Sequence, residues 1–116
     1  ARERSAELGG VRARAHAAVA ELLRGDAPSM NAVARRLALS PRSLQRALAE
    51  EGSSFRAVVD DVRKELALAH LAAPEASIAQ VALLLGFSEP RAFHRAFKRW
   101  TGGTPRAHAA PRAGSD

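Results

Sequence analysis

Apolar residues recur at helical spacing along most of the chain, and no segment alternates between apolar and polar residues over the length of a strand. Glycine or proline interrupts this pattern at residues 25–28, 52–54, 73–75 and 102–103, and a helix interior resists both residue types. The pattern therefore predicts an all-α protein with about seven helices. Residues 1–10 and 106–116 carry too little apolar surface to offset the entropy of ordering them, so we expect flexible ends.

Two parts of the chain, about 48 residues apart, resemble each other. Residues 29–40 align with 77–88, and small and large side chains match throughout. After a one-residue insertion in the second copy, residues 41–48 align with 90–97. An internal repeat indicates two copies of one supersecondary unit, and each copy here predicts two helices joined by a tight turn.

Each copy has the start signals and the inner face of a helix-turn-helix. Pro41 occupies the first position of a predicted helix, and Gly86 is free to take a positive φ in the turn, where Leu39 or Phe87 fills the gap between the helices. The predicted N-caps are Ser29 and Ser77 for the first helices, Ser40 for the second helix of the first copy, and Ser88 or Glu89 for that of the second. The predicted inner faces of the first helices are Met30, Val33, Ala34 and Leu37 in one copy, and Ile78, Val81, Ala82 and Leu85 in the other.

A long helix is predicted between the two copies. Its apolar stripe consists of Phe55, Val58, Val59, Val62, Leu66 and Ala69. Such a helix is about 27 Å long, and successive major-groove faces on one side of B-DNA are about 34 Å apart. The predicted organisation is a flexible segment 1–10, a helix-turn-helix subdomain over 11–53, a linker helix over 54–73, a second such subdomain over 74–105, and a flexible tail over 106–116.

The formal charge of +6 rests on 18 basic residues, of which only Lys64 and Lys98 are lysines. Arginine's planar fork of donors suits phosphate groups and guanine edges. A GC-rich genome also favours arginine and alanine codons, so the charge alone identifies no function.

Several classes of function are excluded by what the sequence lacks. With no cysteine, it has no disulfide scaffold, thiolate zinc site or thiol nucleophile, and we expect a cytoplasmic protein. His16, His70 and His108 have no second ligand at helical spacing, so neither a metal nor a cofactor is expected. There is no glycine-rich phosphate loop or nucleophile elbow, which argues against an enzyme. No apolar run reaches the roughly 18 residues of a membrane span.

Candidate DNA-reading residues lie on the exposed side of the second helix of each copy, which in a helix-turn-helix enters the major groove. The predicted base contacts are Arg42, Ser43, Gln45, Arg46, Arg91, His94 and Arg95. Leu44, Leu48, Phe93 and Phe97 are predicted to point into the core. The predicted phosphate contacts are Ser29, Ser40, Ser77, Ser88, Lys98 and Arg99.

A competing interpretation is that these arginines only solvate a small helical bundle. His94 could equally pack on a neighbouring side chain, and Trp100 is interpreted as a lid on the core. The alternative function is therefore a helical protein-interaction module with only non-specific affinity for DNA.

The sequence resembles the DNA-binding domain of the AraC/XylS family of bacterial transcription regulators. The resemblance covers about residues 29–105 and is carried by 39–46, by 55–71 with Arg63, and most specifically by 78–105. It implies two homeodomain-like helix-turn-helix subdomains that bind adjacent major-groove segments of promoter DNA as one unit. In the family, the positions of the arginine, glutamine and histidine candidates above read bases, and the position of Arg63 is structural.

The resemblance also implies partners and one local departure. Family members act with RNA polymerase and carry an N-terminal effector or dimerisation domain that is missing from this chain, so we expect the isolated domain to be a monomer. Gly103 stands where the family usually has a larger apolar residue, which predicts a looser final turn before Thr104 and Pro105.

Overall fold

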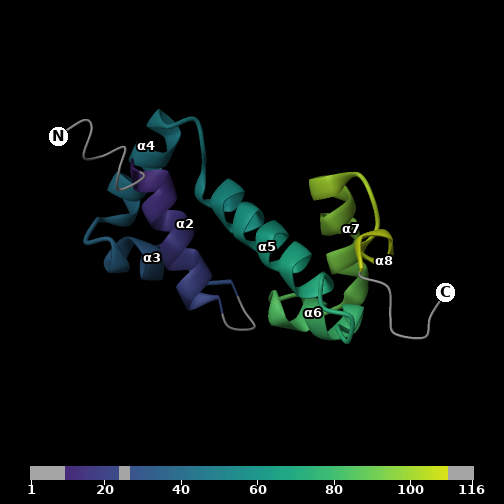
Figure 1. The fold of residues 1–116 in the computed structure, drawn as a ribbon. Coiled ribbons are helices and arrows are strands. Elements are labelled where there is room, and N and C mark those ends of the chain that lie inside the picture. Colours follow the sequence, from purple (N-terminus) through teal and green to yellow (C-terminus); the bar gives the residue numbers. More distant parts are fainter. Residues whose placement is uncertain (1–9, 24–26, 110–116) are drawn as a thin grey trace. The chain divides into compact units, whose positions relative to one another are not determined.

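The computed structural model describes residues 10–23 and 27–109, and seven helices form its framework (Figure 1). They are α2 (Gly10–Leu22), α3 (Met30–Arg36), α4 (Pro41–Glu50), α5 (Phe55–Leu71), α6 (Ile78–Leu84), α7 (Pro90–Thr101) and α8 (Pro105–His108). The described residues contain no strand, which confirms the all-α prediction. The chain divides into two compact units, and the division falls within α5, between Val62 and Arg63.

The first unit consists of three helices packed pairwise, α2, α3 and α4, together with the first half of α5. Its core is aliphatic. Fully buried side chains come from every helix of the unit: Ala15, Val19, Val33, Leu44, Leu48, Val58 and Val62. Burial of this apolar surface, at about 25 cal/mol per Å², is the main force that holds the short helices in place.

The second unit repeats this plan with the second half of α5, followed by α6 and α7, and adds α8 against α7. Its core is partly aromatic. The fully buried side chains include Leu71, Leu85, Phe93, Phe97 and Pro105. The rings of Phe87 and Phe93 lie 5.5 Å apart, and those of Phe93 and Phe97 lie 5.8 Å apart. These are distances at which tilted aromatic pairs attract each other.

Three of the predicted serine caps are confirmed. Ser29 Oγ accepts from the N–H of Ala32 at 3.1 Å, Ser40 Oγ from that of Ser43 at 3.0 Å, and Ser77 Oγ from that of Gln80 at 3.3 Å. Of the two residues predicted as the cap of the last repeated helix, Glu89 and not Ser88 is the N-cap of α7, because the one-residue insertion shifts the start of the helix. The Glu89 side chain makes no capping hydrogen bond.

The turn of each helix-turn-helix has the same backbone hydrogen bonds. The N–H of Leu39 donates to the carbonyl of Ala34 at 2.9 Å, and that of Phe87 donates to the carbonyl of Ala82 at 3.0 Å. The residue before each donor, Ala38 or Gly86, has a positive φ in the left-handed region, as is usual where a helix ends in this kind of turn. Gly86 has φ 90°, which confirms its predicted role.

The apolar stripe predicted for α5 is correct only in its first half. Val58, Val59 and Val62 are buried, whereas Ala69 is exposed. In the second half of the helix, Ala67 and Leu71 are buried instead. A single stripe fails because the two halves of α5 belong to different units, and each half turns its apolar residues to its own core.

The predicted flexible ends differ from the structure where the structure describes them. Helix α2 already begins at Gly10, and α8 (Pro105–His108) extends into the segment expected to be a tail from residue 106. Thr104 caps α8, accepting from the N–H of Ala107 at 3.2 Å, and Pro105 is buried. The rest of both predicted flexible segments, 1–9 and 110–116, lies outside the described residues.

The turn around Gly103 leads directly into α8. The N–H of Gly103 donates to Thr101 Oγ1 at 3.1 Å. A Cβ atom at position 103 would lie only 3.0 Å from Cε1 of His108, and the His108 ring lies 5.0 Å from that of Phe97. The imidazole of His108 therefore occupies the space beside Gly103.

Candidate nucleic-acid interface

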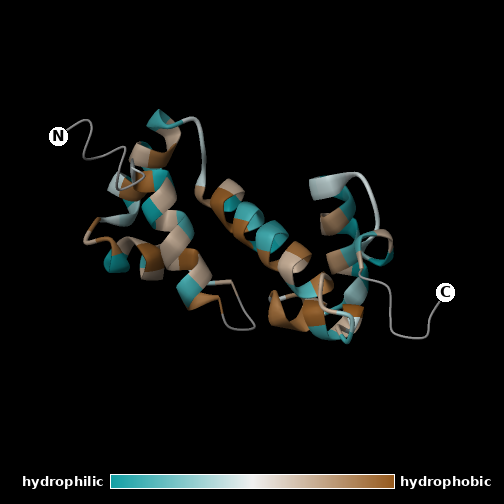
Figure 2. Ribbon diagram, in the orientation of Figure 1, coloured by the Kyte–Doolittle hydropathy of each residue, from teal (hydrophilic) through white to brown (hydrophobic). Residues whose placement is uncertain are grey.

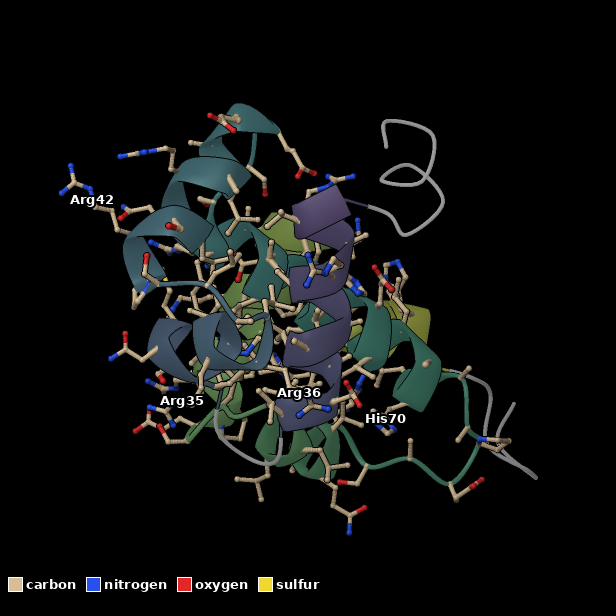
Figure 3. The ribbon with its side chains drawn as sticks, turned by 90° about the vertical axis from the view of Figure 1, so that its left-hand side faces the viewer. Arg35, Arg36, Arg42 and His70 are labelled. Atoms are coloured by element: carbon tan, nitrogen blue, oxygen red, sulfur yellow. The ribbon has the colours of Figure 1, made fainter. Side chains whose placement is uncertain are left out.

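Helix α4 has a polar face that is exposed, because its opposite, apolar face is buried in the core. Ser40 caps it, Pro41 begins it, and Leu44 and Leu48 are both 0% exposed. The exposed side chains on the other face include every predicted base contact of the first unit: Arg42, Ser43, Gln45 and Arg46. Figure 3 shows the Arg42 side chain extending away from the body of the first unit.

Helix α7 is anchored in the same way. Pro90 begins it, and Phe93, Ala96 and Phe97 are buried against the second core. The predicted base contacts of this unit are exposed: Arg91, His94 and Arg95. The helix ends at Gly102, whose φ of 82° lies in the left-handed region that glycine tolerates without steric cost.

The exposed residues of the two helices correspond by position. Each helix carries an arginine, then a glutamine or histidine three positions later, then a second arginine at the fourth position. Residues at this spacing lie on one face of a helix. Arginine can donate two hydrogen bonds to guanine O6 and N7, and glutamine can pair with adenine N6 and N7. Both helices therefore present side chains that can read base edges.

Ser43 and His94 have neighbours that restrict them. The hydroxyl of Ser40 donates to Ser43 Oγ at 2.9 Å, so part of the hydrogen-bonding capacity of Ser43 is already used within the helix end. The His94 ring lies 6.3 Å from the ring of Phe93, edge to face, and is exposed. His94 thus contacts a core ring and still faces solvent.

The predicted phosphate contacts are distributed over both units. In the first unit, Ser29 and Ser40 lie at the N-termini of α3 and α4, where backbone N–H groups favour anions. In the second, Ser77 is half-buried at the N-terminus of α6 and Ser88 is exposed in the turn. Lys98 and Arg99 are exposed in the last turn of α7.

Arg63 supports the second turn from α5. Its Nε donates to the carbonyl of Leu85 at 2.9 Å, and its guanidinium lies 4.6 Å from the centre of the Phe87 ring. Leu85 is the C-cap of α6, so Arg63 satisfies a carbonyl at a helix end that the helix itself leaves without an N–H partner. This geometry agrees with the structural role that the resemblance implied.

Trp100 lies at the edge of the aromatic core. Its ring is 6.1 Å from Phe87 and 6.4 Å from Phe97, and the side chain is half-buried. Its Nε1 is buried without a hydrogen-bond partner among the residues that the structure describes. The contacts fit a lid on the core.

Two features escaped the sequence reasoning. The repeat extends into the preceding helix: Ala15 and Val19 of α2, with Leu23 directly after it, stand 48 positions before Arg63, Ala67 and Leu71 of α5. The repeated element is therefore three helices long in each unit, with α4 or α7 as its third helix. The second feature is the carboxylate of Glu51, which accepts hydrogen bonds from the start of α2, 40 and 39 positions earlier in the sequence. No short-range motif signals a contact of this kind.

Comparison with known proteins agrees with this geometry. Residues 33–110 match the model of an AraC-type helix-turn-helix domain family, and the chain belongs to this family. The two-subdomain fold expected from the sequence is thus confirmed. Within the described residues, no helix is long and apolar enough to cross a membrane.

Three similar proteins illustrate the match. The ornithine utilization regulator of Pseudomonas aeruginosa is 46% identical over 81 residues, which are 70% of this chain and 24% of that protein. The structure of the transcriptional regulator CdpR from Pseudomonas aeruginosa is 38% identical with a TM-score of 0.78, covering 90% of this chain and 33% of that one. The DNA-binding domain of AdpA, a global transcriptional factor solved in complex with a target DNA, is 26% identical with a TM-score of 0.67, covering 84% and 87%. The chain spans about a quarter of the length of the curated relatives it matches.

Proposed function

We propose that this domain binds double-stranded promoter DNA in a sequence-specific manner, with α4 and α7 as the recognition helices of two adjacent major-groove segments. The observation that carries the proposal is the matched polar face of the two helices, with Arg42, Gln45 and Arg46 on one and Arg91, His94 and Arg95 on the other. All six side chains are exposed, while the opposite face of each helix is fully buried. The DNA complex of the AdpA domain, which has the same fold, supports the proposal.

Base readout and phosphate binding are assigned to different residues. The base contacts are the six residues above together with Ser43, whose hydroxyl adds a short-range donor. Phosphate contacts are assigned to Ser29, Ser40, Ser77, Ser88, Lys98 and Arg99, which lie at helix ends and in the second turn. Such contacts set the register of the protein on the duplex, whereas base contacts carry the specificity.

The wider setting follows from the same proposal. The domain serves a bacterial transcription regulator in the cytoplasm, acts with RNA polymerase, and takes its regulation from an effector or dimerisation domain elsewhere in the full-length protein. In isolation it is a monomer that binds DNA without metal, cofactor or catalytic activity.

Selection of randomised duplex DNA by the purified domain, at near-physiological salt, tests the proposal. We expect enrichment of two short motifs about one helical turn apart, and anisotropy should then show tight binding to the enriched duplex and weak binding to a scrambled one. Equal, weak binding to both duplexes, with no motif recovered, would favour a protein-interaction module instead.

The salt dependence of binding provides a second measurement. With about 6 to 8 phosphate contacts, log K should fall with log salt at a slope of roughly −5 to −7. A slope near zero would contradict binding to the DNA backbone.

A further inference from the structure

Glu51 connects the recognition helix of the first unit to the beginning of that unit. It is the C-cap of α4, and its backbone N–H continues the hydrogen bonding of that helix. Its side chain leaves α4 and accepts two hydrogen bonds from the first turn of α2. The N–H of Val11 donates to Oε2 at 2.9 Å, and the N–H of Arg12 donates to Oε1 at 3.3 Å. One carboxylate therefore joins the end of α4 to the start of α2.

The start of α2 is built to receive this carboxylate. Gly10 has φ 65°, and a Cβ atom there would lie 3.2 Å from Oε1 and 3.3 Å from Oε2 of Glu51. A side chain at position 10 would therefore crowd the carboxylate. The first N–H groups of a helix have no partner within the helix and form its positive end, so a carboxylate is the favoured acceptor.

We infer that Glu51 is a positioning residue for base readout by α4, an inference that rests on the proposed function. A ten-residue helix is about 15 Å long, and Arg42 and Arg46 lie in its N-terminal half. Leu44 and Leu48 fix one side of the helix in the core. Glu51 fixes its C-terminal end against α2, so the direction in which the arginines project depends on this contact.

The second unit holds its recognition helix by other means. Helix α7 ends at Gly102, Thr101 Oγ1 donates to the carbonyl of Phe97 at 3.0 Å, and α8 packs on α7. None of these contacts involves Glu51. Loss of the Glu51 carboxylate is therefore expected to disturb readout by α4 and to leave readout by α7 unchanged.

The test compares Glu51→Ala with Glu50→Ala on the duplex selected above. Glu50 is the exposed neighbour on the same helix, so both substitutions remove the same charge. Duplexes altered in one motif or the other report readout by each helix, and the Arg46→Ala and Arg95→Ala variants show which motif belongs to which helix. All measurements are made where circular dichroism shows the variant to be folded.

We expect Glu51→Ala to weaken binding to the selected duplex about tenfold, comparable to the loss of one base contact. Discrimination at the α4 motif should fall, and discrimination at the α7 motif should persist. Glu51→Gln keeps one acceptor oxygen and should recover part of the loss, whereas Glu50→Ala should bind within about twofold of the wild type.

Three results would overturn the inference. One is a Glu51→Ala variant that binds and discriminates like Glu50→Ala, and another is an equal loss of discrimination at both motifs. The third result applies if Glu51→Ala does not fold, in which case Glu51→Gln and Gly10→Ala are measured instead. Unchanged discrimination at the α4 motif in both of these variants would then overturn the inference. A wild-type domain without sequence preference would instead refute the proposed function itself.

Discussion

The turns of the two helix-turn-helix units have the same backbone hydrogen bonds but different residues at their left-handed position. Gly86 occupies it in the second unit with φ 90°, and Ala38 occupies it in the first with φ 60°. A left-handed alanine costs roughly 1 to 2 kcal/mol. The first unit forms the turn nonetheless, and the packing of α3 against α4, with Leu37 and Leu44 buried, offsets this cost.

The same contrast extends to the cores and surfaces. In the first unit the recognition helix is anchored by two leucines and by Glu51, and in the second by an aromatic cluster, Arg63 and α8. On the outer side of α3, Arg35 and Arg36 are exposed, and Arg36 pairs with both carboxylate oxygens of Glu21 at 3.0 Å. The corresponding residues of α6 are Leu83 and Leu84. The two units thus share a backbone plan and differ in the side chains that stabilise it.

Truncating one buried core side chain in each unit should have the largest effect on stability and should show whether the two units unfold separately. Phe97 is 0% exposed and lies within 6.4 Å, centre to centre, of three other rings. We expect Phe97→Ala to lower the free energy of unfolding by about 3 to 5 kcal/mol. Amide hydrogen exchange should show lost protection in α6 and α7, with protection retained in α2 and α4.

The matched variant is Leu48→Ala in the first unit, with an expected cost of about 2 to 5 kcal/mol. Its loss of protection should appear in α2, α3 and α4. Urea denaturation measures both free energies. Equal loss of protection throughout the chain in both variants would show that the units unfold together, contrary to this expectation.

The next largest expected effect is on the free energy of DNA binding. Arg46→Ala and Arg95→Ala are each expected to lose about 1 to 3 kcal/mol on the selected duplex and to relax base choice at one position. The two positions should lie in different motifs, because the arginines belong to different units. Anisotropy on duplexes with single substitutions checks this, and a uniform loss on all duplexes would identify the arginines as phosphate contacts.

Much of the fold could be predicted from local sequence. The helical period, the serine caps and the break residues depend on neighbouring positions, so both turns and every helix except α8 followed from them. The buried faces of α4 and α7 were also predictable, because Leu44 and Phe93 recur with their partners four positions later. The exposure of the candidate base contacts follows from the same period, but their contacts with DNA remain predictions.

The features that escaped prediction depend on long-range packing. The buried side of α5 changes at Val62 because a second core begins there, and hydrophobic period alone cannot reveal which core a residue faces. The contact of Glu51 with Val11 spans 40 positions. The His108 ring that lies beside Gly103 is visible only once α8 is in place.

Exchanging glycine and alanine at the left-handed position of the two turns should change the free energy of unfolding by a smaller amount. Gly86→Ala places a Cβ in a left-handed turn and should destabilise the second unit by about 1 kcal/mol, whereas Ala38→Gly relieves that strain in the first unit and should stabilise it by about 0.5 to 1 kcal/mol. Urea denaturation of both variants measures the two changes. Destabilisation by Ala38→Gly would mean that alanine's lower entropy in the unfolded chain outweighs its strain.

The surface difference should have the smallest effect on stability. Leu83 and Leu84 are 59% and 53% exposed, and Figure 2 shows hydrophobic colour along α6. Replacing both with arginine gives α6 the outer residues of α3, and we expect the free energy of unfolding to change by less than about 0.5 kcal/mol. Since exposed apolar side chains favour association, sedimentation velocity of this variant at high concentration should show no more self-association than the wild type shows.

The matched exchange of Arg35 and Arg36 for leucine removes the exposed ion pair with Glu21, worth about 0.2 to 1 kcal/mol. A larger loss from the α6 exchange than from the α3 exchange would show that the two leucines stabilise the second unit rather than merely covering it.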